Sequence, residues 1–190
     1  MKKIFTIAVA TMIAATSFAQ KGSMFVYGNV GLNSTKFANE SKTSSFELTP
    51  GIGYNLNKDW SVGLAFNLMS NKSTNSLGTD VSKSSTFAFG PFVRYTKNLS
   101  STFSVYGQFD AMFGTDKSGV TPATESKTTT MNLGVTPAVM VHVSKAVAIN
   151  LSFGGLTYGT SKGDYSGAKT ASSFDFNFGK NTMIGLQFNL

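Results

Sequence analysis

Five ionisable residues share the strand face that carries small and polar side chains, and they are the best candidates for chemistry. They are Glu47, Arg94, Asp110, His142 and Asp175. A histidine base, an aspartate that orients it and a serine nucleophile form a hydrolytic triad. His142 and Asp110 with one of the serines could therefore catalyse acyl transfer. A structural interpretation competes with this one, because charged groups held away from water need partners.

We favour the structural interpretation, in which Glu47, Arg94, Asp110 and His142 form a polar network inside the fold. Arg94 and Asp110 are expected on adjacent strands, with Glu47 on the strand before them. His142 is the single histidine of the chain, and it comes one residue before an expected tight turn. The sequence has no nucleophile-elbow motif, and its serines are too numerous for one to stand out. We therefore expect no catalytic residue and no enzyme.

The composition excludes several other kinds of site. The chain has 190 residues and no cysteine, which excludes disulfides and thiolate metal sites. Asp80, Asp116, Glu125 and Asp164 are scattered singly, so no calcium loop is visible. The aromatic side chains occupy the apolar face and are not interleaved with basic residues, which argues against nucleic-acid binding. We expect no metal, no cofactor and no nucleic-acid partner.

The low charge is the unusual feature of the composition. Charged residues make up 13% of the chain, about half of the 25% that is usual in soluble proteins. The chain also contains 17 Phe and 19 Gly. No apolar run after Gln20 approaches the length of a membrane helix, so a helical span is not expected.

Residues 1–19 have the pattern of a secretory signal peptide. Two lysines precede an apolar run over residues 4–15, and residues 17–19 read Ser-Phe-Ala, a small-x-small cleavage signal. Cleavage there would leave residues 20–190 as one mature domain. Its net charge would be +5 in place of +7, because the two lysines are removed with the signal. The alternative is a buried N-terminal helix.

The rest of the chain alternates with a period of two, which is typical of β-strands. In residues 46–56, large apolar side chains alternate with small or polar ones, whereas a helix would scatter them. The same split recurs in residues 60–68, 87–95, 103–113, 131–143, 147–153 and 174–190. The first segment, residues 24–33, is less regular, because Phe25 and Tyr27 lie opposite the valines. The pattern predicts eight strands.

The connections alternate in length, as in an up-and-down barrel with both termini on the short-turn side. Short turns are expected at residues 57–59, 97–101 and 144–145, and long loops at 34–45, 70–85, 115–128 and 159–171. An outer-membrane barrel has this asymmetry, with its long loops outside the cell. The face opposite the apolar one carries few charges, whereas the surface of a soluble barrel is far more charged. The sequence therefore predicts an all-β, eight-stranded antiparallel transmembrane barrel.

Three prolines and one polar segment mark irregular positions in the expected strands. Pro50, Pro91 and Pro137 lie at one depth, each the same distance before a short turn. Proline cannot donate to a ladder, so we expect bulges there. Residues 179–182 interrupt the last strand without changing its parity, and we interpret them as a bulge or polar collar. The alternative is a turn, which would give an odd number of strands.

Two short segments, Gly-Pro-Phe-Val-Arg-Tyr at 90–95 and Phe-Gly-Gly-Leu-Thr-Tyr at 153–158, carry a resemblance to a known family. With the eight strands and the signal peptide, they resemble the small outer-membrane β-barrel family of the OmpX and OmpA transmembrane-domain kind, also labelled porin-like. The final residues 184–190 resemble the terminal strand that the barrel-assembly machinery reads in that family. The family usually ends in an aromatic residue, and Leu190 departs from this. The resemblance implies location in the cell outer membrane and contact with the assembly machinery.

The expected function is non-enzymatic: a monomeric structural protein whose long external loops present a surface for adhesion or another interaction. One alternative is a narrow channel or porin-like passive transport, although eight strands enclose little space. Such a path would have to pass Phe92, Met112 and Met140. The other alternative is a soluble, secreted ligand-binding barrel.

Lysines and aromatic residues mark the two expected membrane boundaries. The lysines expected in the loops are Lys36, Lys42, Lys72, Lys83, Lys117, Lys127, Lys162 and Lys169. They could contact phosphates of lipopolysaccharide or an anionic surface partner, or they could be ordinary solvated loop charge. Tyr54, Trp60 and Tyr95 lie beside short turns, where an aromatic girdle is expected near the periplasmic interface; a simple packing role is the alternative.

Overall fold

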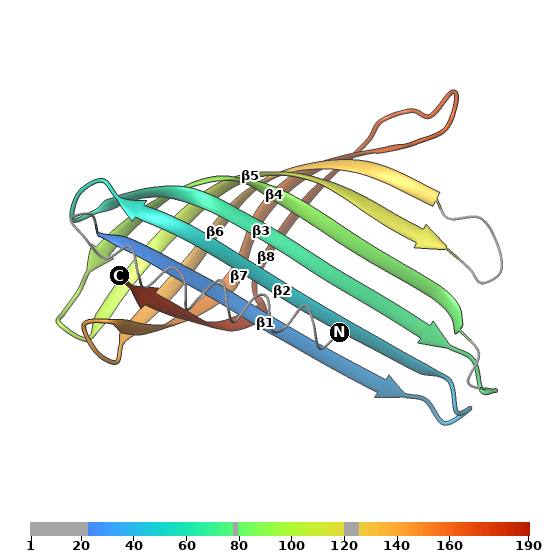
Figure 1. Ribbon diagram of the computed structural model, residues 1–190, viewed down its shortest axis with the longest axis horizontal. Helices are drawn as coiled ribbons and strands as arrows, with labels where there is room; N and C mark the ends of the chain where they lie inside the picture. The colour runs from blue at the N-terminus through green and yellow to red at the C-terminus, as the bar shows by residue number, and fades with distance from the viewer. Residues whose placement is uncertain (1–22, 78–79, 120–125) are drawn as a thin grey trace.

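The computed structural model describes residues 23–77, 80–119 and 126–190, and these form eight antiparallel strands. The strands are β1 (Met24–Lys36), β2 (Lys42–Asn55), β3 (Trp60–Thr74), β4 (Asp80–Asn98), β5 (Phe103–Gly119), β6 (Ser126–His142), β7 (Val147–Gly163) and β8 (Ala171–Asn189). Each strand pairs with the next, and β8 pairs with β1 to close a barrel (Figure 1). The predicted eight-stranded up-and-down barrel is confirmed. The predicted signal peptide lies outside the described residues.

The strand faces divide as the alternation predicts. Large apolar side chains such as Leu64, Phe89 and Phe109 are exposed on the outside. Small and polar residues such as Ala65, Ala88 and Ser104 are buried inside. An apolar exterior and a small polar interior suit a barrel surrounded by lipid, because the narrow interior has room for few large groups. In the part of the chain that the structure describes, no helix is long and apolar enough to span a membrane.

The first strand reverses this rule at its start. Phe25 and Tyr27 point inward and are buried, and they pack against Phe92 of β4. Glycines make room for the rings, because a Cβ at Gly51 would overlap the Tyr27 ring and one at Gly53 would overlap the Phe25 ring. These rings explain the irregular alternation of the segment, since here the large side chains fill the lumen.

The three short turns share one construction. In each, a side-chain oxygen accepts hydrogen bonds from two backbone N–H groups of the turn: Asn57 Oδ1 in the first, Ser100 Oγ in the second and Ser144 Oγ in the third. The donor–acceptor distances lie between 2.9 and 3.2 Å. Asn and Ser stabilise turns in this way because their short side chains reach the backbone ahead of them.

The prolines interrupt three ladders, but a bulge is found beside only one of them. Between β6 and β7 the register shifts between Val135 and Ala138, beside Pro137. Beside Pro50 and Pro91 the β2–β3 and β4–β5 ladders skip pairs and then resume in the same register. The prediction of bulges is therefore confirmed at Pro137 and wrong at the other two, where the missing N–H removes a bond without adding a residue.

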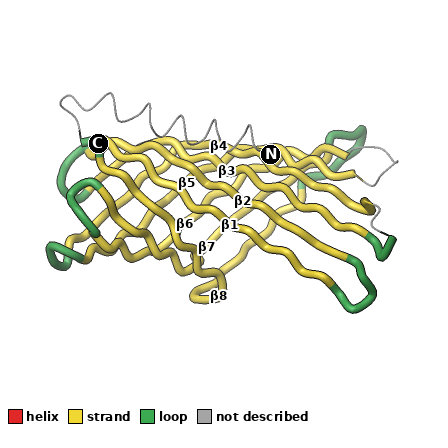
Figure 2. Tube along the Cα trace, turned by 60° about the horizontal axis from the view of Figure 1, so that its bottom comes forward, coloured by secondary structure: helices red, strands yellow, loops and turns green. Residues whose placement is uncertain are grey.

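The last strand kinks and leaves part of the barrel seam unpaired. Residues 179–182 of β8 loop out opposite Phe153 of β7, so the register shifts while the strand continues (Figure 2). This confirms a bulge in place of a turn. Beyond the kink, β8 no longer pairs with β1, whose ladder with β8 covers only Phe25–Asn29 against Gly185–Asn189. In Figure 1 the β7–β8 hairpin leans away from the β1–β2 hairpin at the end opposite the short turns.

At that end the strands continue into segments that the sequence predicts to be long loops. The connection between β1 and β2 is residues 37–41, and the one between β7 and β8 is residues 164–170. The Ser- and Thr-rich segments keep a two-residue alternation, and each added antiparallel pair satisfies backbone groups. Paired strands therefore replace much of the expected loop.

Candidate functional site

Arg94 lies at the centre of the most elaborate side-chain cluster in the lumen. Its side chain is 1% exposed. Its Nε and Nη2 donate hydrogen bonds of 3.0 and 2.7 Å to Gln108 Oε1 on the adjacent strand β5. Its Nη1 donates one of 2.8 Å across the barrel to Gln187 Oε1 on β8. The guanidinium thus joins two walls of the barrel through amide oxygens.

Four aromatic rings surround the same guanidinium. Its Cζ lies 4.2 Å from the ring centroid of Tyr106, 4.6 Å from that of Tyr27 and 4.9 Å from that of Phe25. The Phe92 ring is at 5.5 Å. The negative faces of aromatic rings attract a cation at such distances, more strongly when water is excluded. Among the described residues Arg94 forms no ion pair, so rings and amide oxygens compensate its charge.

The cluster links β1, β4, β5 and β8 at the short-turn half of the barrel. Gln108 also donates from Nε2 to the Tyr27 hydroxyl over 3.2 Å, which holds the amide for its bond to Arg94. Gln187 donates from Nε2 to Asn189 Oδ1 over 2.9 Å. The arrangement fills the lumen and braces the strands around it.

The four predicted network residues are not brought together. Asp110 lies next to Phe92 in the β4–β5 ladder and is not a partner of Arg94. Glu47 is on β2, separated from β4 by β3, and its Oε1 accepts a hydrogen bond of 3.2 Å from Asn67 Nδ2. Asp175, the fifth candidate, accepts a hydrogen bond of 2.6 Å from Asn177 on its own strand. The polar interior therefore consists of separate small groups.

His142 has a serine partner, and within the described ranges no carboxylate joins the pair. Its Nε2 lies 2.7 Å from Ser104 Oγ, which also donates to Asn98 Oδ1 over 2.7 Å. Ser104 is fully buried, so no substrate can reach the hydroxyl. Asp110 is six residues further along β5 than Ser104. The three residues of the hydrolytic hypothesis are thus not assembled into a triad.

Gln108, Gln187, Tyr27 and Tyr106 are not among the site residues that the sequence predicts. Parity places Gln108 and Tyr106 on the inward face with Arg94, and this signal could have identified them. The contact with Gln187 joins positions 93 residues apart, and no local pattern predicts it. In the described ranges, no three His, Cys, Asp or Glu side chains come together as a metal site.

Comparison with known proteins places the chain in a family. Residues 5–181 match the family described as outer membrane protein beta-barrel domain. The chain belongs to this family, and it is an outer-membrane β-barrel protein. The predicted soluble alternative is therefore wrong. No curated protein matches the chain.

Solved outer-membrane barrels share the fold at low sequence identity. OprG from Pseudomonas aeruginosa aligns with a TM-score of 0.52 and 12% identity, over 89% of this chain and 96% of its own. A major outer membrane protein from Thermus thermophilus has a TM-score of 0.52 and 11% identity, over 90% of this chain and 100% of its own. Neisserial surface protein A aligns with a TM-score of 0.47 and 14% identity, over 89% of this chain and 96% of its own. At these identities the likeness to OprG and to the Thermus thermophilus protein concerns the fold alone.

Proposed function

We propose that the protein is a non-enzymatic outer-membrane barrel that acts through its external end, as a structural and adhesion-like surface protein. The observation that carries the proposal is the buried Arg94 cluster, which occupies the lumen between β1, β4, β5 and β8. The interior of an eight-stranded barrel is just wide enough for side chains to fill it or for one small ligand. With the lumen occupied, the external hairpins remain as the surface that can meet a partner.

The length of the strands supports an external role. A tilted strand needs about 9–11 residues to cross a bilayer, whereas β5, β6 and β7 have 17 residues each. The surplus lies at the end opposite the short turns and projects the hairpins into water. Paired strands hold these hairpins more rigidly than long loops would, and a rigid surface loses less entropy when it binds.

A conductance measurement tests the occupied lumen. We expect the purified wild-type barrel to give no stable current steps in planar lipid bilayers. The double variant Arg94→Ser with Phe92→Ser should give steps, because it removes two groups that fill the lumen. Regular current steps from the wild type would favour the alternative of a narrow channel and would overturn the closed lumen.

An attachment assay tests the external end. The barrel is expressed in a host that does not attach to glass, and attached cells are counted by staining. A matched variant replaces residues 37–41 and 164–170 with Asn-Gly turns and keeps the ladders below them. We expect the wild type to raise attachment and the variant to lose the effect at equal surface level. Equal attachment by both, or none by the wild type, would count against the adhesion-like role.

A further inference from the structure

An outward-facing series of three residue types repeats near the external end of seven strands. On each of these strands, an apolar residue is followed by Ser or Thr two positions nearer the external end. A Lys follows two positions further in the same direction along the strand. The series are Leu32-Ser34-Lys36, Phe46-Ser44-Lys42, Leu68-Ser70-Lys72, Phe87-Ser85-Lys83, Phe113-Thr115-Lys117, Met131-Thr129-Lys127 and Tyr158-Thr160-Lys162. Residues two apart share a strand face, so the series forms a hydroxyl ring and, above it, a lysine ring. We call the two rings together the lysine belt.

The belt places positive charges directly opposite one another on neighbouring strands. Lys36 lies opposite Lys42, Lys72 opposite Lys83, and Lys117 opposite Lys127. Like charges directly opposite one another destabilise a strand pair. Lys36 also forms an ion pair of 2.6 Å with Glu40 on the connection beyond it.

Among the strand residues whose side chains the structure describes, four carboxylates lie on the opposite face. Glu47, Asp110, Asp116 and Asp175 all have the parity of the lumen-facing residues. Cations on the outside and these carboxylates on the inside are separated by the strand backbone. Lysines held directly opposite one another repel, and an anion bound between them outside the barrel would lower that repulsion.

The belt lies at the depth of the lipid headgroups. Trp60 and Tyr95 pack together, with ring centroids 5.0 Å apart, beside the short turns. Lys72 and Lys83 lie twelve residues away from them along β3 and β4. Twelve residues at about 3.3 Å, tilted by 35–45°, rise roughly 28–33 Å. The apolar band of such barrels is about 25 Å tall, so the lysines lie just outside it.

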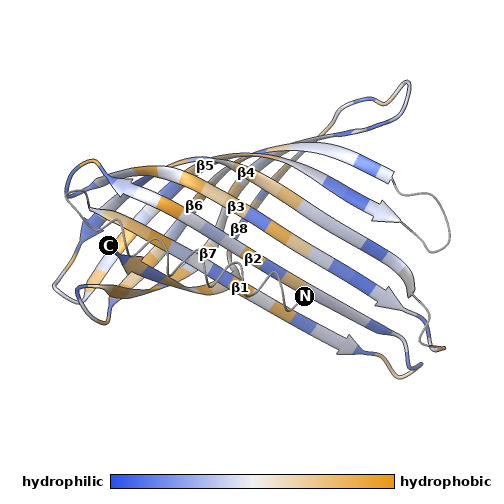
Figure 3. Ribbon diagram, in the orientation of Figure 1, coloured by the Kyte–Doolittle hydropathy of each residue, from blue (hydrophilic) through white to orange (hydrophobic). Residues whose placement is uncertain are grey.

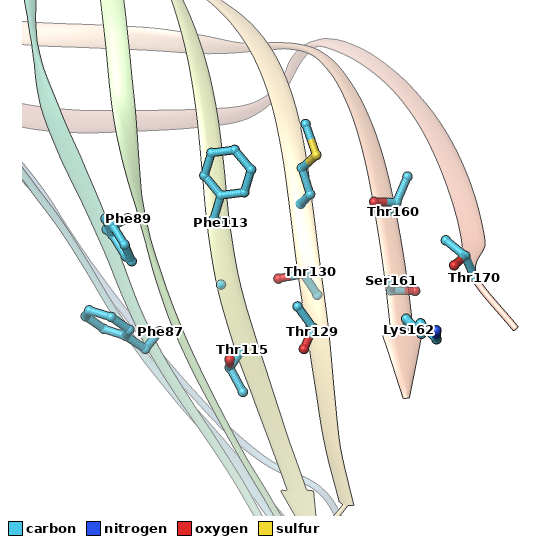
Figure 4. A pocket seen from close by; sticks show the side chains of 12 residues that line it. Phe87, Phe89, Phe113, Thr115, Thr129, Thr130, Thr160, Ser161, Lys162 and Thr170 are labelled. Carbon is cyan, nitrogen blue, oxygen red and sulfur yellow. The ribbon is translucent and has the colours of Figure 1, made fainter. Parts of the chain in front are cut away.

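A groove on the outer face of β4 to β7 follows the same series (Figure 4). Its volume is about 500 Å³. Phe87, Phe89, Phe113 and Met131 line its apolar part, and Thr115, Thr129, Thr160 and Lys162 line its polar part. The short hydroxyl side chains leave a hollow between the larger apolar residues and the lysines. An acyl chain fits the apolar part and a phosphate fits the hydroxyl and ammonium donors.

We propose that the lysine belt binds the phosphate groups of a phosphorylated glycolipid of the outer leaflet, lipopolysaccharide in chemical class. The lysines and ring hydroxyls hold the phosphates, and the acyl chains lie against the phenylalanines of the groove. Figure 3 shows hydrophilic residues along the strand ends at this level, beyond the apolar part of the wall. The proposal depends on the outer-membrane location and not on the adhesion-like role.

The test compares two triple variants that remove equal charge. Lys117→Ser, Lys127→Ser and Lys162→Ser remove three belt lysines on adjacent strands. The control Lys58→Ser, Lys97→Ser and Lys145→Ser removes three exposed lysines at the opposite end. Each barrel is reconstituted in phosphatidylcholine vesicles with or without lipid A. Lipid A molecules that stay bound after detergent release are counted by native mass spectrometry.

We expect the wild type and the control to retain lipid A. The belt variant should retain at least about tenfold less lipid A, because it lacks several charge-assisted contacts. Inorganic phosphate added to the vesicles that contain lipid A should not compete. If the belt variant does not fold, the wild type is measured with rising salt, which should weaken retention. Equal retention by both variants, retention that salt does not weaken, or full competition by inorganic phosphate would each overturn the proposal.

Discussion

Arg94 shows how a single charge can be accommodated inside a barrel without a carboxylate. Three hydrogen bonds to Gln108 and Gln187 use the guanidinium donors, and four rings cover its faces. Neutral partners avoid burying a second charge, which would carry its own desolvation penalty. The residue joins β4 to strands on two sides, so its loss should affect the whole short-turn half of the barrel.

Replacing Arg94 by Met should lower the free energy of unfolding by about 2–4 kcal/mol, because the amide oxygens of the buried Gln187 and the half-buried Gln108 lose their donors. The measurement is urea unfolding of the barrel in lipid vesicles. The matched control is the triple variant Arg94→Met, Gln108→Leu and Gln187→Leu. It should recover much of the loss, since removing all partners leaves fewer groups unpaired. If the Arg94→Met variant were as stable as the wild type, Arg94 would not brace the barrel.

The glycines under the rings should tolerate no side chain. Gly53→Val should lower the free energy of unfolding by at least about 2 kcal/mol or prevent folding, since its Cβ would overlap the Phe25 ring. Gly107→Val is the matched control, because a Cβ there meets nothing within 4 Å. Valine also suits a strand better than glycine does. Heat-modifiability gels measure the folded fraction of each variant as the temperature rises. Equal folded fractions for the two variants would argue against the packing of the Phe25 ring on Gly53.

Replacing His142 by Ala should leave the barrel folded, with a loss of about 1 kcal/mol for its hydrogen bond to Ser104. Lipid release from labelled vesicles should be the same for wild type and variant, because the buried serine has no access to substrate. Release by the wild type that the variant lacks would support the hydrolytic hypothesis.

At the scale of the strands, the weak point is the seam between β1 and β8. The ladder covers five residue pairs and stops at the kink in residues 179–182. Phe174, Phe176 and Phe178 beyond the kink are 67–69% exposed, whereas Phe87, Phe89 and Phe109 are 47–50% exposed. Unpaired backbone groups are tolerated at membrane depth only where they meet protein or water. The free edges therefore need water that enters from the external end, in the half of the barrel away from the Arg94 cluster.

Hydrogen exchange of the barrel in lipid should reveal this edge. Backbone amides of residues 173–178 that face β1 should exchange at least about tenfold faster than those of residues 105–110 in β5, which are paired on both sides. Residues 185–189, paired with β1, should be as slow as β5. Uniform protection along β8 would mean that the seam is closed in the membrane.

The sequence predicts the faces of most strands because lipid and lumen select opposite side-chain types along each one. It does not predict the start of β1, since Phe25 and Tyr27 are apolar residues that fill the lumen and so have the wrong parity. It also misses the bond from Arg94 to Gln187, which depends on barrel closure. The predicted loops are too long because Ser and Thr are common in loops but also pair well in strands that extend into water.

At the scale of the whole molecule, an aromatic pair and the lysine belt define the membrane-spanning height. Trp60 and Tyr95 lie at one boundary, and the lysine belt lies at the other. The apolar stretch between them should match a hydrocarbon thickness of about 25–30 Å. The barrel cannot tilt its strands freely, because strand number and stagger fix the tilt. Its stability should therefore depend on bilayer thickness.

We expect the urea midpoint of the reconstituted barrel to pass through a maximum as phosphatidylcholine acyl chains lengthen, because mismatch costs free energy for each ångström in either direction. The variant Ser44→Leu, Ser70→Leu and Ser85→Leu extends the apolar face toward the lysines on β2, β3 and β4. Its maximum should shift to longer chains. Serine-to-threonine replacement at the same three positions keeps the hydroxyls and should leave the maximum in place. A maximum that stays fixed in the leucine variant would mean that the belt does not set the outer boundary.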